Sequence, residues 1–188
     1  ALDTVDGGDG NDILEIVGTS GADDFRITSF GKINGADSNK FKVANFKAGV
    51  AAGSITGTKF EDLRLDARAG ADKISLDYMA GSGLGFIALS TGKNVVRTGT
   101  ECVNDPESGQ PIEQPKFTVS DDRAADTVTI LGHDGDDDVV TLAENTEKGI
   151  AGIGVSFGAG LPQIGVSDSV RGEGDTLGID TRKGDDSR

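Results

Sequence analysis

The amino-acid sequence predicts an all-β fold made of short strands and glycine-rich corners. Apolar and polar residues alternate in short runs such as ILEI, LRLD and TVTIL, the chain has 29 glycines, and acidic residues recur at fixed offsets from apolar ones. Alternation with a period of two, bounded by Gly and Asp, is typical of strands separated by tight turns. We expect parallel β-helix or β-roll-like coils. The alternative is a tandem β-sandwich, because units of this length are a normal size for sandwich domains.

The composition is acidic and poor in apolar residues. The 188 residues are 35% hydrophobic, and 32 acidic against 18 basic side chains give a formal net charge of -14. This charge opposes compaction unless cations are bound, and it makes nucleic acid or an anionic membrane surface a poor partner. No apolar run is long enough for a transmembrane segment, and the N-terminus lacks the features of a signal peptide. We therefore expect an excised mature fragment.

Short motifs repeat along the chain. The pattern U-D-x-x-x-G-x-D-x-U-x-U, with U apolar, begins at Val5 and again at Leu65. A step of 11 residues joins Asp12 to Asp23, Asp126 to Asp137, and Asp175 to Asp186. The same step joins the apolar pairs Leu14 and Phe25, Leu63 and Ile74, and Val128 and Val139. Each unit is interpreted as a strand, a Gly/Asp corner and a second strand.

A longer repeat divides the chain. A shift of 114 residues (126 - 12) aligns Asp12 with Asp126 and Asp72 with Asp186. Three prolines fall before the second copy begins, at Pro106, Pro111 and Pro115. We predict a first repeat unit at 1–105, a linker or long loop at 106–116, and a second, truncated unit at 117–188. In such an array each unit is supported by its neighbours.

One segment has a recognisable motif. Residues 7–15, GGDGNDILE, match G-G-x-G-x-D-x-U-x at every specified position, and looser versions begin at Gly18 and Gly132. The segment resembles the haemolysin-type (RTX) calcium-binding repeat. The resemblance implies a parallel β-roll whose Gly-rich turns hold calcium between successive coils. Because one copy alone is perfect and the local step is 11, the chain looks like a degenerate RTX region of a large bacterial secreted or surface protein.

The aspartates of the corners are the candidate metal ligands. Calcium takes six to eight oxygen ligands, which Asp carboxylates and the carbonyls of Gly-rich turns can supply. The strongest candidates are Asp12, Asp23, Asp72, Asp126, Asp137 and Asp186, followed by Asp9, Asp134 and Asp175. The competing interpretation is that Asp and Gly are simply favoured turn residues.

Catalytic machinery is not expected. The single histidine, His133, lies in an acidic turn, the single cysteine, Cys102, cannot form an internal disulfide, and no hydrolase or zinc motif is present. We expect a calcium-stabilised structural module of an extracellular or cell-surface bacterial protein or filament, which folds on calcium binding. Its expected partners are neighbouring repeat units, with self-assembly as one form of this contact. The alternatives are an adhesion module that binds carbohydrate or a surface receptor, and a β-helix enzyme that modifies polysaccharide.

Overall fold

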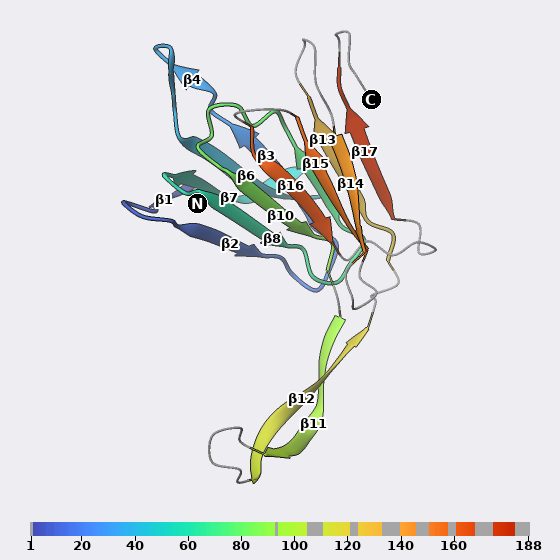
Figure 1. Cartoon of the computed structure of the whole chain (residues 1–188). Coiled ribbons are helices and arrows are strands. Elements are labelled where there is room, and N and C mark those ends of the chain that lie inside the picture. The colour runs from blue at the N-terminus through green and yellow to red at the C-terminus, as the bar shows by residue number, and fades with distance from the viewer. Residues whose placement is uncertain are drawn as a thin grey trace.

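The computed structural model describes residues 2–92, 94–104, 111–120, 124–132, 140–145, 151–157, 161–167 and 175–182. Within these ranges the regular structure consists of β-strands, in two large sheets and two small hairpins, so the all-β prediction is confirmed (Figure 1). The described residues include no helix with the length and apolar character needed to cross a membrane.

Seven strands form the larger sheet, called sheet A. In spatial order it contains β1 (Leu2–Asp6), β7 (Val50–Thr58), β6 (Lys40–Lys47), β3 (Asp24–Ser29), β9 (Lys73–Leu76), β13 (Thr127–Leu131) and β17 (Thr176–Asp180). Strand β6 is antiparallel to both of its neighbours, and every other pair in the sheet is parallel.

Six strands form sheet B. In spatial order it contains β14 (Val140–Asn145), β15 (Ala151–Ser156), β16 (Gln163–Ser167), β10 (Phe86–Ser90), β8 (Asp62–Asp66) and β2 (Ile13–Val17). Strand β15 is antiparallel to its neighbours, and the remaining pairs are parallel. The hairpins are β4 (Lys32–Ile33) with β5 (Ala36–Asp37), and β11 (Asn94–Asn104) with β12 (Pro111–Ser120).

The two sheets are connected as a stack of levels. Strand β2 leads directly into β3, and β8 leads directly into β9, so each pair places one strand in each sheet. Strands β10 and β13 form a third level, with the β11–β12 hairpin between them along the chain, and β16 and β17 form a fourth. We call these levels 1 (β2 and β3), 2 (β8 and β9), 3 (β10 and β13) and 4 (β16 and β17). Their strands are parallel from level to level within each sheet.

Four apolar rows that run through the stack form the main part of the core. The alternating positions of each strand face inward, and the strand register aligns them between levels. In sheet B the rows are Leu14, Leu63, Ile87 and Ile164, and Ile16, Leu65, Leu89 and Val166. In sheet A they are Phe25, Ile74, Val128 and Leu177, and Ile27, Leu76, Ile130 and Ile179. The residues of levels 2 and 3 in these rows are almost fully buried, whereas Leu14, Ile16, Leu177 and Ile179 at the two ends are partly exposed.

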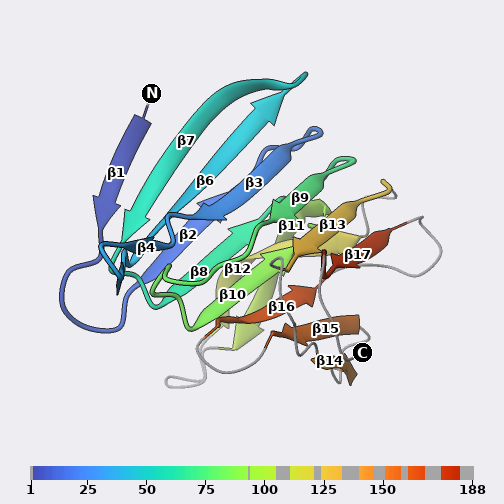
Figure 2. The ribbon, with the colours of Figure 1, turned by 90° about the horizontal axis from the view of Figure 1, so that it is seen from above.

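The two sheets have different extents at the ends of the stack. Beyond β3, sheet A continues with β6, β7 and β1, whereas sheet B ends at β2 (Figure 2). Beyond β16, sheet B continues with β15 and β14, whereas β17 is the last described strand of sheet A. The β11–β12 hairpin projects away from both sheets (Figure 1).

The structure also shows what the sequence repeats correspond to. The step of 11 from Leu14 to Phe25, and from Leu63 to Ile74, carries the chain from sheet B to sheet A within one level. The shift of 114 instead relates Asp12, which precedes β2 of sheet B, to Asp126, which precedes β13 of sheet A. Residues aligned by that shift therefore lie in opposite sheets.

Strands from the two predicted repeat units pair with each other. Strand β9 pairs with β13 and β10 pairs with β16, so residues of 1–105 and of 117–188 share both sheets. In the stretch expected to be a linker or loop, residues 111–116 belong to β12, and 106–110 lie outside the described residues. The boundaries of the units stay a prediction from the sequence.

Candidate functional site: a ladder of aspartates

The repeated motif forms the same turn wherever it is described. The aspartate that ends the strand accepts a hydrogen bond from the amide two residues later: Asp6 from Gly8 at 3.0 Å, and Asp66 from Arg68 at 2.9 Å. Gly8 and Arg68 have positive φ angles of 93° and 67°. Asp180 and Arg182 repeat this contact at 2.9 Å, with a φ of 62° at Arg182. Such turns are a known use of Asp, whose short side chain mimics a backbone turn.

Successive corners are joined by a ladder of aspartates, one per level, each placed immediately before a strand of sheet A. The Asp23 amide donates to Asp72 Oδ1 at 2.7 Å, the Asp72 amide to Asp126 Oδ1 at 2.7 Å, and the Asp126 amide to Asp175 Oδ1 at 3.0 Å. We call Asp23, Asp72, Asp126 and Asp175 the aspartate ladder. The first three are 2%, 1% and 3% exposed, so their carboxylates are buried.

Main-chain hydrogen bonds run beside the ladder in the opposite direction. The amides of Lys73, Thr127 and Thr176 donate to the carbonyl oxygens of Asp23, Asp72 and Asp126 at 2.9, 2.9 and 2.8 Å. Each pair of neighbouring rungs is therefore joined by one side-chain bond and one main-chain bond. Hydrogen bonds to a charged group contribute roughly 1.5–3 kcal/mol each, so the ladder is a substantial link between levels.

The ladder is capped at Asp23, its first rung. Thr19 donates to Asp23 Oδ2 through its amide at 2.7 Å and its hydroxyl at 2.9 Å, and Asn45 Nδ2 of β6 donates to Oδ1 at 2.9 Å. Lys47 Nζ lies 3.9 Å from the same oxygen. Burial alone would raise the pKa of Asp23, but the hydrogen bonds from Asn45 and Thr19 and the charge of Lys47 outweigh it, so that this pKa lies below its usual value.

The sheet B side has one corresponding contact, at Asp12. The Asp12 amide donates to Glu61 Oε2 at 2.7 Å, and the amides of Glu61 and Asp62 both lie 3.2 Å from the Asp12 carbonyl oxygen. Asp12 precedes β2 as Glu61 precedes β8, so the donor again belongs to level 1 and the acceptor to level 2. Asp12 Oδ2 is buried and has no hydrogen-bond partner among the residues that the structure describes.

Of the nine predicted ligands, Asp23, Asp72, Asp126 and Asp175 come together in the ladder. Asp12 lies at the outer corner of level 1, and Asp9 is exposed in the same corner. Asp134, Asp137 and Asp186, together with His133, lie outside the described residues. Within the described ranges, no three His, Cys, Asp or Glu side chains are grouped closely enough to hold a metal ion.

Sequence reasoning missed Thr19, Asn45 and Lys47, which lie around the first rung of the ladder, and Glu61, which accepts the Asp12 amide. A signal for Glu61 was present, because the pairs Asp12 with Glu61, Asp23 with Asp72, and Asp126 with Asp175 are each 49 residues apart. The middle step, from Asp72 to Asp126, is 54 residues, which obscures this period.

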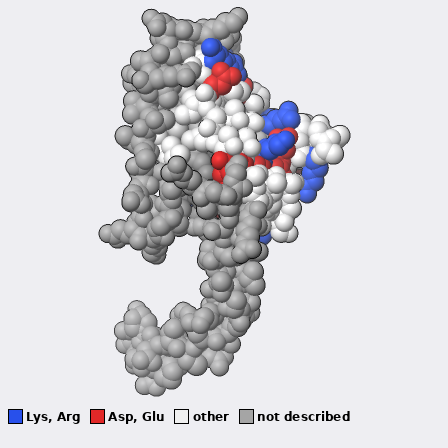
Figure 3. Space-filling model, turned by 90° about the vertical axis from the view of Figure 1, so that its right-hand side faces the viewer, with Lys and Arg blue, Asp and Glu red and all other residues white. Residues whose placement is uncertain are grey.

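Exposed charges form local pairs. On the described part of the face in Figure 3, acidic side chains lie close to basic ones among uncharged residues. The described ion pairs include Arg182 with Asp77 at 2.8 Å and Arg26 with Asp24 at 3.2 Å. Exposed pairs of this kind contribute little to stability.

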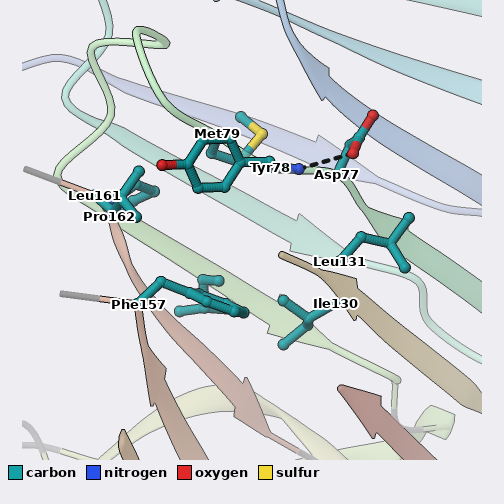
Figure 4. Close-up of a pocket in the computed structure, with 9 residues that line it drawn as sticks. Asp77, Tyr78, Met79, Ile130, Leu131, Phe157, Leu161 and Pro162 are labelled. Atoms are coloured by element: carbon teal, nitrogen blue, oxygen red, sulfur yellow. Dashed lines mark hydrogen bonds between the residues drawn. The ribbon is translucent and has the colours of Figure 1, made fainter. Parts of the chain in front are cut away.

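A small apolar cavity lies between Tyr78, Phe157 and Ile130 (Figure 4). Its volume of about 10 Å³ is close to that of a single water probe, and the lining is mostly carbon. Asp77 stands at its margin and accepts the Tyr78 amide at 2.9 Å. This cavity is too small for a sugar or any other organic substrate.

Comparisons of the chain with protein-family models, with curated proteins and with solved structures found no match.

Proposed function

We propose that this chain is a non-catalytic structural repeat module of an extracellular bacterial surface protein or filament. The observation that carries the proposal is the aspartate ladder, in which the same contact recurs between levels 1 and 2, 2 and 3, and 3 and 4. A catalytic site uses a set of residues that occurs once, whereas a contact repeated along a stack joins one unit to the next. This property is expected of an extended scaffold.

The proposed architecture is a β-roll-like stack with antiparallel extensions. Parallel pairing through four levels of both sheets supports this interpretation. The alternative, a pair of tandem sandwiches, would place antiparallel neighbours throughout each sheet. The inserted strands β6, β7, β14 and β15 account for the described antiparallel pairs within sheets A and B.

Calcium is the proposed cation, on the evidence of sequence and charge. Neighbouring parallel strands lie about 4.8 Å apart, so stacked ladder carboxylates repel one another unless they are neutralised. Lys47 approaches the first rung at 3.9 Å, and the net charge of -14 leaves the chain in need of cations. Calcium would supply this neutralisation from outside the cell, which couples folding to export.

The described residues fit calcium only in part. Asp12 Oδ2 is a buried carboxylate oxygen without a hydrogen-bond partner in the described ranges, and it belongs to the RTX-like nonapeptide. Asp12 and Glu61 alone do not provide the six to eight oxygens that calcium takes. The other proposed ligands are the corner aspartates Asp9, Asp23, Asp72, Asp126, Asp134, Asp137, Asp175 and Asp186.

An adhesion module is the second candidate. The projecting β11–β12 hairpin supports it, because a segment that stands away from the stack is accessible to a carbohydrate or a surface receptor (Figure 1).

Thermal unfolding with and without calcium tests the structural proposal. We expect circular dichroism in calcium to show a cooperative β-sheet transition, and excess EDTA to lower the melting temperature or abolish the transition. Magnesium is the matched control, because it demands a smaller, octahedral site and should not substitute. Equal melting curves in calcium, magnesium and EDTA would contradict the calcium part of the proposal.

A further inference from the structure

Strand β2 is an open edge of sheet B. It pairs with β8 on one side, and no described strand pairs with it on the other. Its inward residues Leu14 and Ile16 are partly exposed, although the equivalent Leu63 and Leu65 of β8 are 0% and 1% exposed. An unpaired strand with apolar residues and free main-chain groups is a template for a further strand.

The polarity of the ladder shows which group is missing at this edge. In every described rung the amide belongs to one level and the accepting carboxylate to the next level along the stack. Asp12 would therefore accept an amide from a level before level 1. Asp23 occupies the same position in sheet A, and there Thr19 and Asn45 satisfy the carboxylate. At Asp12 the carboxylate accepts no amide from a described residue, and its Oδ2 is buried.

A groove runs beside the same edge. Sheet A extends past β2 through β6, β7 and β1, and the space between them is a cavity of about 250 Å³. Its apolar lining includes Ile16, Phe25, Val43 and Ile55, with Asp3 and Asn45 among its polar residues. A strand added to β2 would direct every second side chain into this groove.

We propose that this edge binds a strand from a neighbouring repeat unit, which adds to sheet B parallel to β2. The strand donates a main-chain amide to Asp12 Oδ2 and places alternate apolar side chains against Ile16 and Phe25. The inference rests on the proposed function, because it assigns the contact through which one module meets the next. This contact repeats, one level earlier in the stack, the hydrogen bond that the Asp12 amide donates to Glu61. Addition of a strand to an exposed sheet edge is an established mode of recognition.

A small ligand would satisfy only part of this edge. A cation would satisfy Asp12 Oδ2 but would leave the groove and the row of β2 main-chain groups unfilled. An apolar molecule would fill the groove but leave the carboxylate oxygen and the edge unpaired. A strand satisfies the carboxylate oxygen, the edge and the groove together.

A fluorescent peptide with the sequence of residues 59–66, KFEDLRLD, is the probe. It contains β8, the strand that already pairs in parallel with β2, and its third residue supplies the amide for Asp12. The binding experiment uses the folded chain and peptide at up to about 1 mM, a range that detects weak association. Anisotropy measures binding, and NMR amide exchange locates it. We expect protection of the β2 amides and not of those in β14 or β17.

Two variants test the predicted contacts. Ile16→Lys places a charge in the groove and should abolish binding. Asp12→Ala removes the acceptor and should weaken binding about tenfold, the equivalent of one hydrogen bond to a charged group. Asn11→Ala, an exposed neighbour in the same corner, should leave binding unchanged. A peptide with both leucines replaced by asparagine should not bind.

Several results would overturn the inference: no protection of the β2 amides at the highest peptide concentration, protection at another edge, or peptide binding by Asp12→Ala as strong as by the wild type. If the chain stays folded in EDTA, the peptide titration is run both in EDTA and in calcium. If it unfolds in EDTA, the titration is run in calcium alone. If the peptide bound in EDTA but calcium prevented its binding at Asp12, the inference would be overturned. The same result would support the proposed function. If calcium raises the melting temperature but the peptide does not bind, the proposed function stands and only this contact is refuted. Dimers that are lost in Ile16→Lys would support the inference, because a second copy supplies strands of the same kind.

Discussion

The corner at residues 6–12 and the corner at residues 66–72 have the same motif and the same turn, yet their last aspartates are in different situations. Asp72 is 1% exposed, accepts the Asp23 amide and donates its own amide to Asp126. Asp12 donates its amide to Glu61, but its carboxylate accepts no amide from the described part of the chain. The local sequence fixes the turn, whereas the levels on either side decide what the carboxylate does. An aspartate of this motif is therefore a rung inside the stack and an attachment point at its end.

Replacing the final aspartate of each corner tests this difference most strongly. We expect Asp72→Ala to lower the free energy of unfolding by about 2–3 kcal/mol, because the buried Asp23 amide loses its acceptor. Where no calcium is bound at its carboxylate, Asp12→Ala should cost less than about 0.5 kcal/mol, because it removes an acceptor that no described amide uses. Urea unfolding under identical cation conditions measures both. Asp72→Asn keeps an acceptor oxygen and should recover part of the loss, and equal losses at the two corners would refute the distinction.

Replacing the glycine of each corner tests the packing of one corner on another. Gly10 and Gly70 occupy the same motif position, with φ angles of 134° and 138°, so alanine is strained at both. A Cβ on Gly70 would lie 2.7 Å from the Gly21 carbonyl carbon, whereas the nearest atom to a Cβ on Gly10 is Asp12 Oδ2 at 3.8 Å. We expect Gly70→Ala to cost about 1–2 kcal/mol more than Gly10→Ala, since backbone must move to admit it.

Chemical denaturation of the two glycine variants gives this difference directly. Gly21→Ala is a matched control in the neighbouring corner, because a Cβ there meets nothing within 4 Å. Its unfolding free energy should change little. Similar losses for Gly10→Ala and Gly70→Ala would mean that the corners do not pack against each other as the structure indicates.

The sequence predicted the strands and corners of the levels because their determinants are local. Alternating apolar residues in Leu63–Leu65 or Phe25–Ile27 and the Asp/Gly turns need only a few adjacent residues to be recognised. The partner of each strand depends on the whole stack and could not be predicted in this way. The motif forms the same turn from β1 of sheet A and from β8 of sheet B, so it carries no information about which sheet follows.

The sequence indicated aspartates of the candidate site but not the hydrogen bonds that they make. Asp23, Asp72, Asp126 and Asp175 are four of the nine aspartates predicted as metal ligands, and that role stays a prediction. Their hydrogen bonds to amides one level away depend on a period that the inserted strands interrupt. Asn45 caps the first rung from β6, an antiparallel strand outside the repeat, and nothing in the motif indicates it. Glu61 was missed because it replaces the aspartate of the pattern.

The smallest predicted effect concerns the pH dependence of the capped rung. The ordinary pKa of an aspartate is 3.8, and that of Asp23 lies below it in the folded chain. The ionised Asp23 therefore contributes stability that is present above pH 3.8 and is lost as the pH falls through the lower, folded pKa. Asn45→Ala removes one hydrogen bond to the carboxylate, so the pKa of Asp23 should rise and the loss should begin at a higher pH.

We expect the difference in unfolding free energy between wild type and Asn45→Ala to be about 1 kcal/mol at neutral pH and to shrink as Asp23 becomes protonated. NMR titration of the Asp23 carboxyl carbon measures the pKa itself. Asn11→Ala, an exposed asparagine in the corner of Asp12, is the control, and its effect should not vary over the same pH range. If the two variants had the same pH dependence, Asn45 would not be a cap of the ladder, and Thr19 would remain as the described hydrogen-bond donor to the Asp23 carboxylate.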